Sequence, residues 1–493
     1  MRKKFILILC AASCCLGVLS LSALGQDTSK DKVGKIDSLM RAYYDNGRFN
    51  GTVLVAESGK VIYKKGFGLA NREWDIPNTP DTKFRIGSLT KQFTSMLVLQ
   101  MVGEGKVRLE GKLSDYLPYY RSDTGQKVTI HHLLTHTSGI PNYTSLPNFG
   151  REVRRTPYGV EEFVKKFCSC DLEFEPGARF SYDNSGYFLL GAVIEKIAGK
   201  PYENVLEQKI FQPLGMKNSG YDHHQTILSH RAAGYDQSLA GFTNSDYIDM
   251  SSPFAAGALY STVEDLYLWD QALYTDKLLP AQLKGLLFMP HAQGQGPAYG
   301  YGWNVGNKKL PRSQREIPFT SHSGGISGFG SLIERLVGDR HLIVLLNNTG
   351  PTTTGEMSTA IVRILYDEPY ELPKKSISRT LYKTIQHQGL EAGLSQYREL
   401  KKAQPTEYDF RFAELNRLGY ALLEGERTDD AIRIFQLNVE SFPQEGNAYD
   451  SLAEAYAIKG DRTQAIKNYA RSLELDPENA NAVDQLKRLI KTE

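Results

Sequence analysis

Apolar residues recur at helical spacing in the stretch that follows Ser88. The repeating positions are Leu89, Phe93, Met96, Leu97, Leu99, Met101 and Val102. This pattern predicts a largely buried helix that begins at or near Ser88. Two further helices are expected, one amphipathic over residues 33–48 and one around Thr354–Leu365.

Short apolar runs bounded by turn residues predict strands of one sheet. Residues 51–57 and 60–68 flank a Ser-Gly pair and are expected to form a hairpin. Residues 255–269 are interpreted as a strand followed by a helix with Ser261 or Thr262 as its cap. Four more runs are interpreted as successive strands, at residues 299–303, 320–325, 328–335 and 341–348.

Past Pro373 the composition changes to charged, helix-favouring residues, which marks a domain boundary. Two windows here match at an offset of 34 residues: Leu418, Gly419, Ala431, Phe435 and Pro443 correspond to Leu452, Ala453, Ala465, Tyr469 and Pro477. This repeat length resembles helix–turn–helix units of the tetratricopeptide (TPR) kind. Residues 378–403 are expected to form a divergent helical pair before them, and residues 478–491 a capping helix. The predicted domains after the N-terminal segment are therefore residues 26–370 and an all-α TPR-like domain at 371–493.

The N-terminus has the layout of a secretory signal. A basic Met1-Arg-Lys-Lys segment precedes an apolar run, and Ala23-Leu-Gly25 places small residues where signal peptidase reads. Residues 1–25 are therefore interpreted as a signal peptide that is cleaved near Gly25, so the protein is expected to be secreted or periplasmic. The alternatives are an uncleaved membrane anchor and lipidation at Cys14 or Cys15.

Length, charge and cysteine content narrow the class of protein. A chain of 493 residues is long enough for about two to four domains. Its 58 basic and 56 acidic residues nearly balance, so nothing points to nucleic acid as a partner. Beyond the signal segment only Cys168 and Cys170 remain, which is too few for a disulfide framework, and packing roles are favoured over a redox pair.

Candidate chemistry begins with Ser88-x-x-Lys91. The spacing puts the amine on the same helix face as the hydroxyl, close to free backbone N–H groups and the positive end of the helix dipole. A serine nucleophile needs a base within reach, and a lysine can serve when burial lowers its pKa. The spacing alone does not exclude a helix-capping serine with a surface lysine, because Ser29 and Lys32 share it in a polar segment.

Two more motifs follow in order, Tyr182-x-Asn184 at a loop-to-helix junction and His322-x-Gly324 in a glycine-rich strand. With Ser88-x-x-Lys91 and connecting stretches such as 132–139, 175–182 and 213–216, they make residues 33–366 resemble the serine β-lactamase and penicillin-binding-protein family. The similarity is to its class C, D-alanyl-D-alanine carboxypeptidase and esterase branch. It implies an α/β (α+β) β-lactamase-like three-layer catalytic domain, with an antiparallel sheet flanked by helices. It also implies a serine hydrolase that uses neither a cofactor nor a metal.

The resemblance further implies a role for each motif residue. Ser88 would attack a carbonyl and become acylated, while Lys91 and Tyr182 would share the proton transfers, with either as the base. The backbone N–H groups of Ser88 and Gly325 would form the oxyanion hole, where one donor is typically worth ~2.7–4 kcal/mol. The substrate-binding residues would be Asn184, which would also hold Lys91, and His322, Ser323 and Gly324.

Two positions depart from the family pattern. Many relatives have Lys-Thr-Gly where this chain has His322-Ser-Gly. A histidine with a pKa near ~6.5 is mostly neutral at pH 7, which puts efficient β-lactam turnover in doubt and favours a peptidase or esterase with a less acidic substrate. Asp183 replaces a serine common in relatives; it would raise the pKa of Lys91 if it pointed inward, and we expect it to point out. His132 and His136 are expected to pack and cap, because no third ligand lies at metal-binding spacing.

The expected partner is a small acyl substrate, namely a peptide, an ester or a β-lactam, and the sequence does not choose among them. Pocket walls would come from loops such as 142–172 and 220–253, and the repeats could bind a protein partner. The competing interpretation is a catalytically weak or inactive scaffold that binds peptidoglycan or a partner through the repeats. The motif residues Ser88, Lys91, Tyr182 and Asn184 are all intact, which argues against a scaffold.

Overall fold

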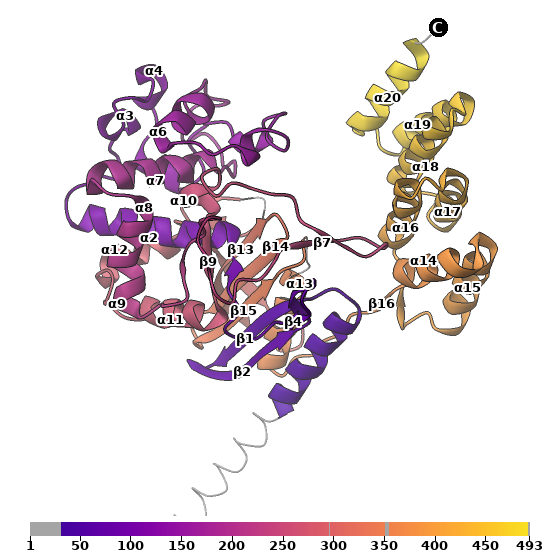
Figure 1. The fold of residues 1–493 in the computed structure, drawn as a ribbon, viewed down its shortest axis with the longest axis horizontal. Helices are drawn as coiled ribbons and strands as arrows, with labels where there is room; N and C mark the ends of the chain where they lie inside the picture. Colours follow the sequence, from indigo (N-terminus) through magenta and orange to yellow (C-terminus); the bar gives the residue numbers. More distant parts are fainter. Residues whose placement is uncertain (1–30, 295, 351–353, 492–493) are drawn as a thin grey trace, which may run out of the picture. The chain divides into compact units, whose positions relative to one another are not determined.

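The computed structural model describes residues 31–294, 296–350 and 354–491, and these divide into two compact units (Figure 1). The first unit comprises the residues up to Asp236 together with Asn244–Glu371, and the second comprises Gln237–Thr243 and Leu372–Glu493. The signal peptide interpreted at residues 1–25 lies outside the described residues. Within the described ranges, no helix combines the length and the apolar character needed to cross a bilayer.

Among the described residues, the first unit is built on an eight-stranded antiparallel sheet with the order β10-β11-β12-β13-β14-β15-β1-β2. The strands are β1 (Gly51–Glu57), β2 (Lys60–Phe67), β10 (Ala292–Gln293), β11 (Ala298–Tyr299), β12 (Asn304–Lys309), β13 (Glu316–Ile326), β14 (Phe329–Leu336) and β15 (His341–Asn347). The hairpin predicted at the first two strands is confirmed. It turns through Ser58 and Gly59, which both have positive φ as a tight hairpin requires.

Alternate residues of the central strands face two different cores. On β15, Val344 belongs to one core, whereas Ile343 and Leu345 belong to the other. The first core includes residues of α2 (Thr90–Gly103), α7 (Ser185–Ala198) and α11 (Val263–Leu273), and the second includes helical residues 31–45 and α13 (Thr354–Leu365). The sheet therefore lies between two helical layers, which confirms the predicted three-layer fold.

Short elements complete the first unit. They are α3 (Leu113–Tyr116), α4 (Ser122–Gly125), α5 (Ile130–Leu134), α6 (Val160–Phe163), α8 (Tyr202–Leu206), α9 (Gln212–Leu214), α10 (Phe254–Gly257), α12 (Ala281–Gly285) and the strands β3 (Leu69–Asn71), β4 (Ile76–Pro77), β5 (Phe84–Arg85), β6 (Gly220–Tyr221) and β9 (Leu259–Ser261). Strands β7 (Tyr235–Gln237) and β8 (Phe242–Asn244) each have residues in both units. The strand expected from residue 255 is wrong at its start, because residues 255–257 belong to α10 and only β9 is extended. Thr262 caps α11 by accepting a hydrogen bond from the backbone of Asp265. Cys168 and Cys170 are free thiols, and Cys168 is buried in the first core.

The second unit is helical. It contains α14 (Ile377–Gln388), α15 (Leu390–Ala403), α16 (Phe412–Glu424), α17 (Thr428–Ser441), α18 (Gly446–Lys459), α19 (Arg462–Leu475) and α20 (Ala480–Lys491), with β16 (Lys375–Ser376) paired to β17 (Tyr408–Asp409). From the first residues of these helices, α18 begins 34 positions after α16 and α19 begins 34 positions after α17. Gln237–Thr243 also belongs to this unit, and its Leu239 packs against the helical core. The sequence analysis did not anticipate that segment.

Candidate active site

Ser88 lies in a 3₁₀ turn, Gly87–Leu89, that leads directly into α2. Two glycines bring this turn against β13. A Cβ on Gly87, whose φ is 52°, would lie 2.9 Å from the backbone nitrogen of Gly325. A Cβ on Gly324 would lie 2.1 Å from the carbonyl oxygen of Ile86 and 3.0 Å from the backbone nitrogen of Ser88. Only glycine permits such backbone contact, so these two positions bring the serine turn and the strand end together.

The side chain of Lys91 is fully buried one turn into the helix. Its Nζ donates to Ser88 Oγ at 3.1 Å, to Asn184 Oδ1 at 2.8 Å and to the carbonyl oxygen of Ala256 at 3.0 Å. Burial lowers the pKa of Lys91 to about 7, although the carboxylate of Asp183 opposes the shift. Near neutral pH, a large fraction of this amine is therefore unprotonated and able to accept the proton of Ser88.

Tyr182 and Asn184 come from the segment that ends at the first turn of α7. The ring of Tyr182 is 38% exposed, its hydroxyl hydrogen-bonds Ser88, and Lys91 Nζ lies 5.0 Å from the ring centroid. The surrounding protein excludes water from the hydroxyl and so raises the pKa of Tyr182, although part of the ring is exposed. The hydrogen bond to Ser88 offsets part of this rise. The phenol is therefore protonated at neutral pH and can donate to a departing group.

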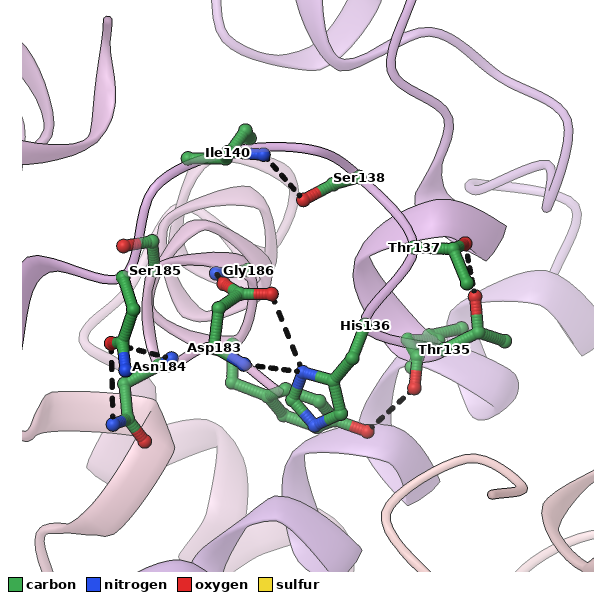
Figure 2. Close-up of polar contacts among 12 residues, drawn as sticks. Thr135, His136, Thr137, Ser138, Ile140, Asp183, Asn184, Ser185 and Gly186 are labelled. Carbon is green, nitrogen blue, oxygen red and sulfur yellow. Dashed lines mark hydrogen bonds and ion pairs between the residues drawn. The ribbon is translucent and has the colours of Figure 1, made fainter. Parts of the chain in front are cut away.

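Asp183 points inward, so the expectation that it would face solvent is wrong (Figure 2). Its Oδ1 accepts the backbone N–H of Gly186 in the first turn of α7, where the helix dipole favours a negative charge. Its backbone N–H donates to Nδ1 of His136 at 3.2 Å, and Oδ2 lies 3.4 Å from the same nitrogen. Asp183 thus supplies a hydrogen-bond acceptor for the first turn of α7. Its carboxylate is also the negative charge that limits the downward pKa shift of Lys91.

The packing and capping roles expected for His132 and His136 agree with the structure. His136 is buried among aromatic rings, including those of Tyr182 and Tyr299, and burial lowers its pKa. Nδ1 of His132 accepts the backbone N–H of Thr129 at the start of α5. In the part of the chain that the structure describes, no group of three or more His, Cys, Asp or Glu residues could hold a metal ion.

His322 lies on β13 and is buried. Nδ1 lies 2.6 Å from the carbonyl oxygen of Ser323, so it carries the proton, and Nε2 accepts from the hydroxyl of Tyr299 at 3.0 Å. Burial, assisted by the positive charge of Lys91, lowers the pKa of His322 to about 3. This position therefore provides a neutral side chain in place of a fixed positive charge.

Two cavities meet at Ser88 and Gly325. The first has a volume of about 360 Å³ and is lined by Tyr182, His322 and Ser323 among others. We refer to it as the Tyr182 cavity. The second has a volume of about 220 Å³, and its lining includes Asn184, Tyr143, Phe149 and Arg154. We refer to it as the Arg154 cavity. A carbonyl placed at Ser88 would have one substituent in each.

The sequence analysis missed several residues that position the site. Nδ2 of Asn184 donates to Thr144 Oγ1 at 3.4 Å, and its backbone N–H donates to Asn142 Oδ1 at 3.1 Å. Tyr299 holds His322, and the carbonyl of Ala256 holds Lys91. Asn142 begins a loop that was expected only to contribute pocket walls, and Tyr299 lies in a stretch that was assigned only to a strand. No local pattern marks these contacts, because each joins residues that are far apart in the chain.

Comparisons with known proteins agree with this geometry. A family model described as Beta-lactamase matches residues 36–367. The chain is 29% identical over 378 residues to penicillin-binding protein 4* of Bacillus subtilis, which covers 72% of this chain and 82% of that protein. It is 28% identical over 322 residues to the teichoic acid D-alanine hydrolase of Staphylococcus aureus, covering 65% of this chain and 75% of that protein. Among solved structures, the penicillin-binding protein from Bacillus halodurans is similar with a TM-score of 0.59 and 29% identity, over 66% of this chain and 98% of that one.

The fold and the comparisons together define a serine hydrolase. The matched region spans more than half of the chain, and the chain belongs to the Beta-lactamase family.

Proposed function

We propose that the protein is a secreted or periplasmic hydrolase that forms an acyl-enzyme on Ser88, acting on a peptide amide, an ester or a β-lactam. The observation that carries the proposal is the buried Lys91 amine, which lies 3.1 Å from the Ser88 hydroxyl and has a pKa of about 7. A catalytic base is most efficient when its pKa lies near the working pH, and the pKa of Lys91 meets this condition at neutral pH. The export part of the proposal rests on the signal-like pattern of residues 1–25.

In the acylation step, Ser88 Oγ bonds to the substrate carbonyl carbon while its proton passes to Lys91, or to Tyr182 after that phenol has given its own proton to Lys91. The carbonyl oxygen accepts hydrogen bonds from the backbone N–H groups of Ser88 and Gly325, which the glycine contacts of the serine turn bring close together. The leaving group takes a proton from Tyr182 and departs, and the proton taken from Ser88 replaces it within the Lys91–Tyr182 pair. Water then attacks the ester on Ser88 and gives a proton to the same pair; the bond to Ser88 Oγ breaks, the pair returns that proton to Oγ, and the acid product is released.

The substrate proposal favours an ester or a peptide over a β-lactam. His322 is neutral, so this position offers no charge for the carboxylate that a β-lactam carries. The printed name of one relative, a teichoic acid D-alanine hydrolase, describes a substrate that is not a β-lactam, and it supports the proposal to that extent only. Asn184, with Ser323 and Gly324, would hold the substrate against β13.

We further propose that α16–α19 form two TPR-like repeats, with α20 as a cap. The 34-residue spacing of the helix starts supports this, as does the packing of Gly419, where a Cβ would lie 2.4 Å from the ring of Phe435. The role proposed for this unit is to bind a protein partner. A scaffold without catalysis is disfavoured. Burying the Lys91 amine costs folding free energy, and a protein that only binds a partner has no need of a buried amine beside Ser88.

Covalent labelling tests the proposed function. A fluorophosphonate probe should add mass to the peptide that contains Ser88, and Ser88→Ala should remove both the label and hydrolysis of a small ester. Ser95→Ala is the matched control, because Ser95 is a serine of the following helix α2 that is buried and bonds Tyr187; this variant should keep the label. Labelling that survives Ser88→Ala would contradict the assignment.

A further inference from the structure

The Arg154 cavity combines apolar walls with one cation. Tyr143, Phe149, Ile248 and Pro253 are among the residues that line it. Among the described residues that line this cavity, Arg154 carries the only side chain that is permanently charged. Ser88, Thr144, Asn184 and Ser327 add neutral polar groups to this lining. A few placed polar groups in a largely apolar pocket are the usual means of selecting a ligand with matching groups.

Arg154 is not neutralised by its ion-pair partner. Its Nη2 bonds Asp246, but Asp246 also accepts from Arg155 Nη2 at 3.1 Å. Two guanidinium groups share one carboxylate, so the cluster keeps a net positive charge. In addition, Nε of Arg154 is buried and has no hydrogen-bond partner among the described residues. A guanidinium presents five N–H donors; because Nε is buried, the donors available to an acceptor in the cavity are the Nη hydrogens that the bond to Asp246 leaves free.

The position of the proton donor indicates which part of the substrate enters this cavity. Tyr182 lines the other cavity, together with His322 and Ser323. The group that departs must receive its proton from Tyr182, so it occupies the Tyr182 cavity. The acyl group, which stays on Ser88, therefore extends into the Arg154 cavity beside Asn184.

We infer that the Arg154 cavity selects acyl groups with an apolar body and a carboxylate, which Arg154 binds. This inference rests on the proposed acyl-enzyme function and adds the chemical class of the acyl group. It also separates the chain from hydrolases of D-aminoacyl groups, because the ammonium of such a group would be repelled by Arg154. Arginine is suited to the task, since its planar donor pair matches a carboxylate.

The test compares acyl groups that differ only in charge. The probes are 4-nitrophenyl monoesters of adipic and pimelic acid, and the same compounds with the free carboxyl blocked as a methyl ester. Release of nitrophenol, corrected for a blank without enzyme, gives kcat/KM for each. The parent should prefer the anionic ester by about tenfold, equivalent to ~1.4 kcal/mol.

Three variants assign the preference to Arg154. Arg154→Met should bring the ratio of anionic to neutral kcat/KM close to one. Arg155→Met removes the same amount of charge, but its half-exposed side chain belongs only to the shared Asp246 pair; the variant leaves Arg154 paired one-to-one with Asp246, so it should reduce the preference in part and less than Arg154→Met. Asp246→Asn should increase the ratio, because it removes the competing carboxylate. Melting temperatures measured alongside identify any variant that fails to fold.

The outcomes separate this inference from the proposed function. Hydrolysis of both esters with equal kcat/KM in the parent would overturn the inference and leave the acyl-enzyme function standing. A preference that Arg154→Met does not reduce would also overturn it. Absence of Ser88-dependent hydrolysis of either ester would overturn both.

Discussion

Two basic side chains are buried on opposite sides of Ser88, one on the helix and one on the strand. Lys91 on α2 is surrounded by oxygen atoms, namely those of Ser88, Asn184 and Ala256, and its pKa falls to about 7. His322 on β13 lies between the hydroxyl of Tyr299 and the carbonyl of Ser323, and its pKa falls to about 3. The same physical cause, burial, therefore has different consequences on the two sides.

The difference follows from where each pKa starts. A lysine begins far above neutral pH, so a large downward shift brings it into the range where it exchanges protons. A histidine begins near neutrality, so burial removes it from that range. In the proposed mechanism, proton transfer therefore belongs to the helix side of the site, while the strand side would contribute a fixed shape, neutral hydrogen bonds and the backbone N–H of Gly325.

The largest expected effect comes from the helix side. Lys91→Ala and Tyr182→Phe should each lower kcat/KM for a small ester by ~10²–10⁴, because each removes part of one proton path. The double variant should be little worse than the poorer single variant. Losses that multiply, measured in a double-mutant cycle, would show that the two residues act separately.

The pH profile should report Lys91 and not His322. If the neutral amine is the base, kcat/KM rises about tenfold per pH unit below pH ~7 and levels off above it. His322 is neutral throughout that range and adds no inflection. Asp183→Asn removes the charge that favours protonated Lys91, so the inflection should move to lower pH.

A profile that instead falls through pH 7 would contradict this proton path, because neither Lys91 nor Tyr182 can accept a proton when both are protonated. Melting temperatures of Asp183→Asn are needed as a control, because this variant also weakens the bond to Gly186 at the start of α7.

A smaller effect is expected on the strand side. His322→Gln should lower kcat/KM by roughly three- to tenfold, the range for one neutral hydrogen bond, without moving the pH inflection. Tyr299→Phe breaks the same hydrogen bond from its other end and is the matched variant. A shift of the inflection in either variant would mean that the strand side takes part in proton transfer.

The smallest effect should follow removal of residues 372–493, since both sides of the site lie before them. The truncated protein should keep kcat/KM for a small ester within about twofold, because no motif residue is lost. It should melt at a lower temperature, because Leu239 in the segment Gln237–Thr243 packs in the helical core that is removed. The truncation also exposes Leu239 and should therefore lower solubility. Adding Leu239→Ser to the truncated protein should restore it. A truncated protein that melts normally yet loses most turnover would show that the helical unit shapes the active site.

Features set by local spacing could be predicted from the sequence. The helix after Ser88 and the three-residue step to Lys91 depend only on helical periodicity, which is visible in the positions of the apolar residues. The same is true of the hairpin at Ser58 and of the strand that carries His322. The helical structure past residue 373 was also predicted from the composition and from the 34-residue repeat of positions such as Ala431 and Ala465.

Features set by packing between distant segments were decided only in three dimensions. Whether Asp183 faces inward depends on His136, 47 residues away, and on its place at the first turn of α7. No periodic pattern in the sequence indicates the partner of His322, the carbonyl that holds Lys91 or the sharing of Asp246 by two arginines. Burial sets the pKa values, and burial is a property of the assembled core. The sequence alone could therefore indicate the candidate reactive groups, whereas tertiary contacts determined their charges.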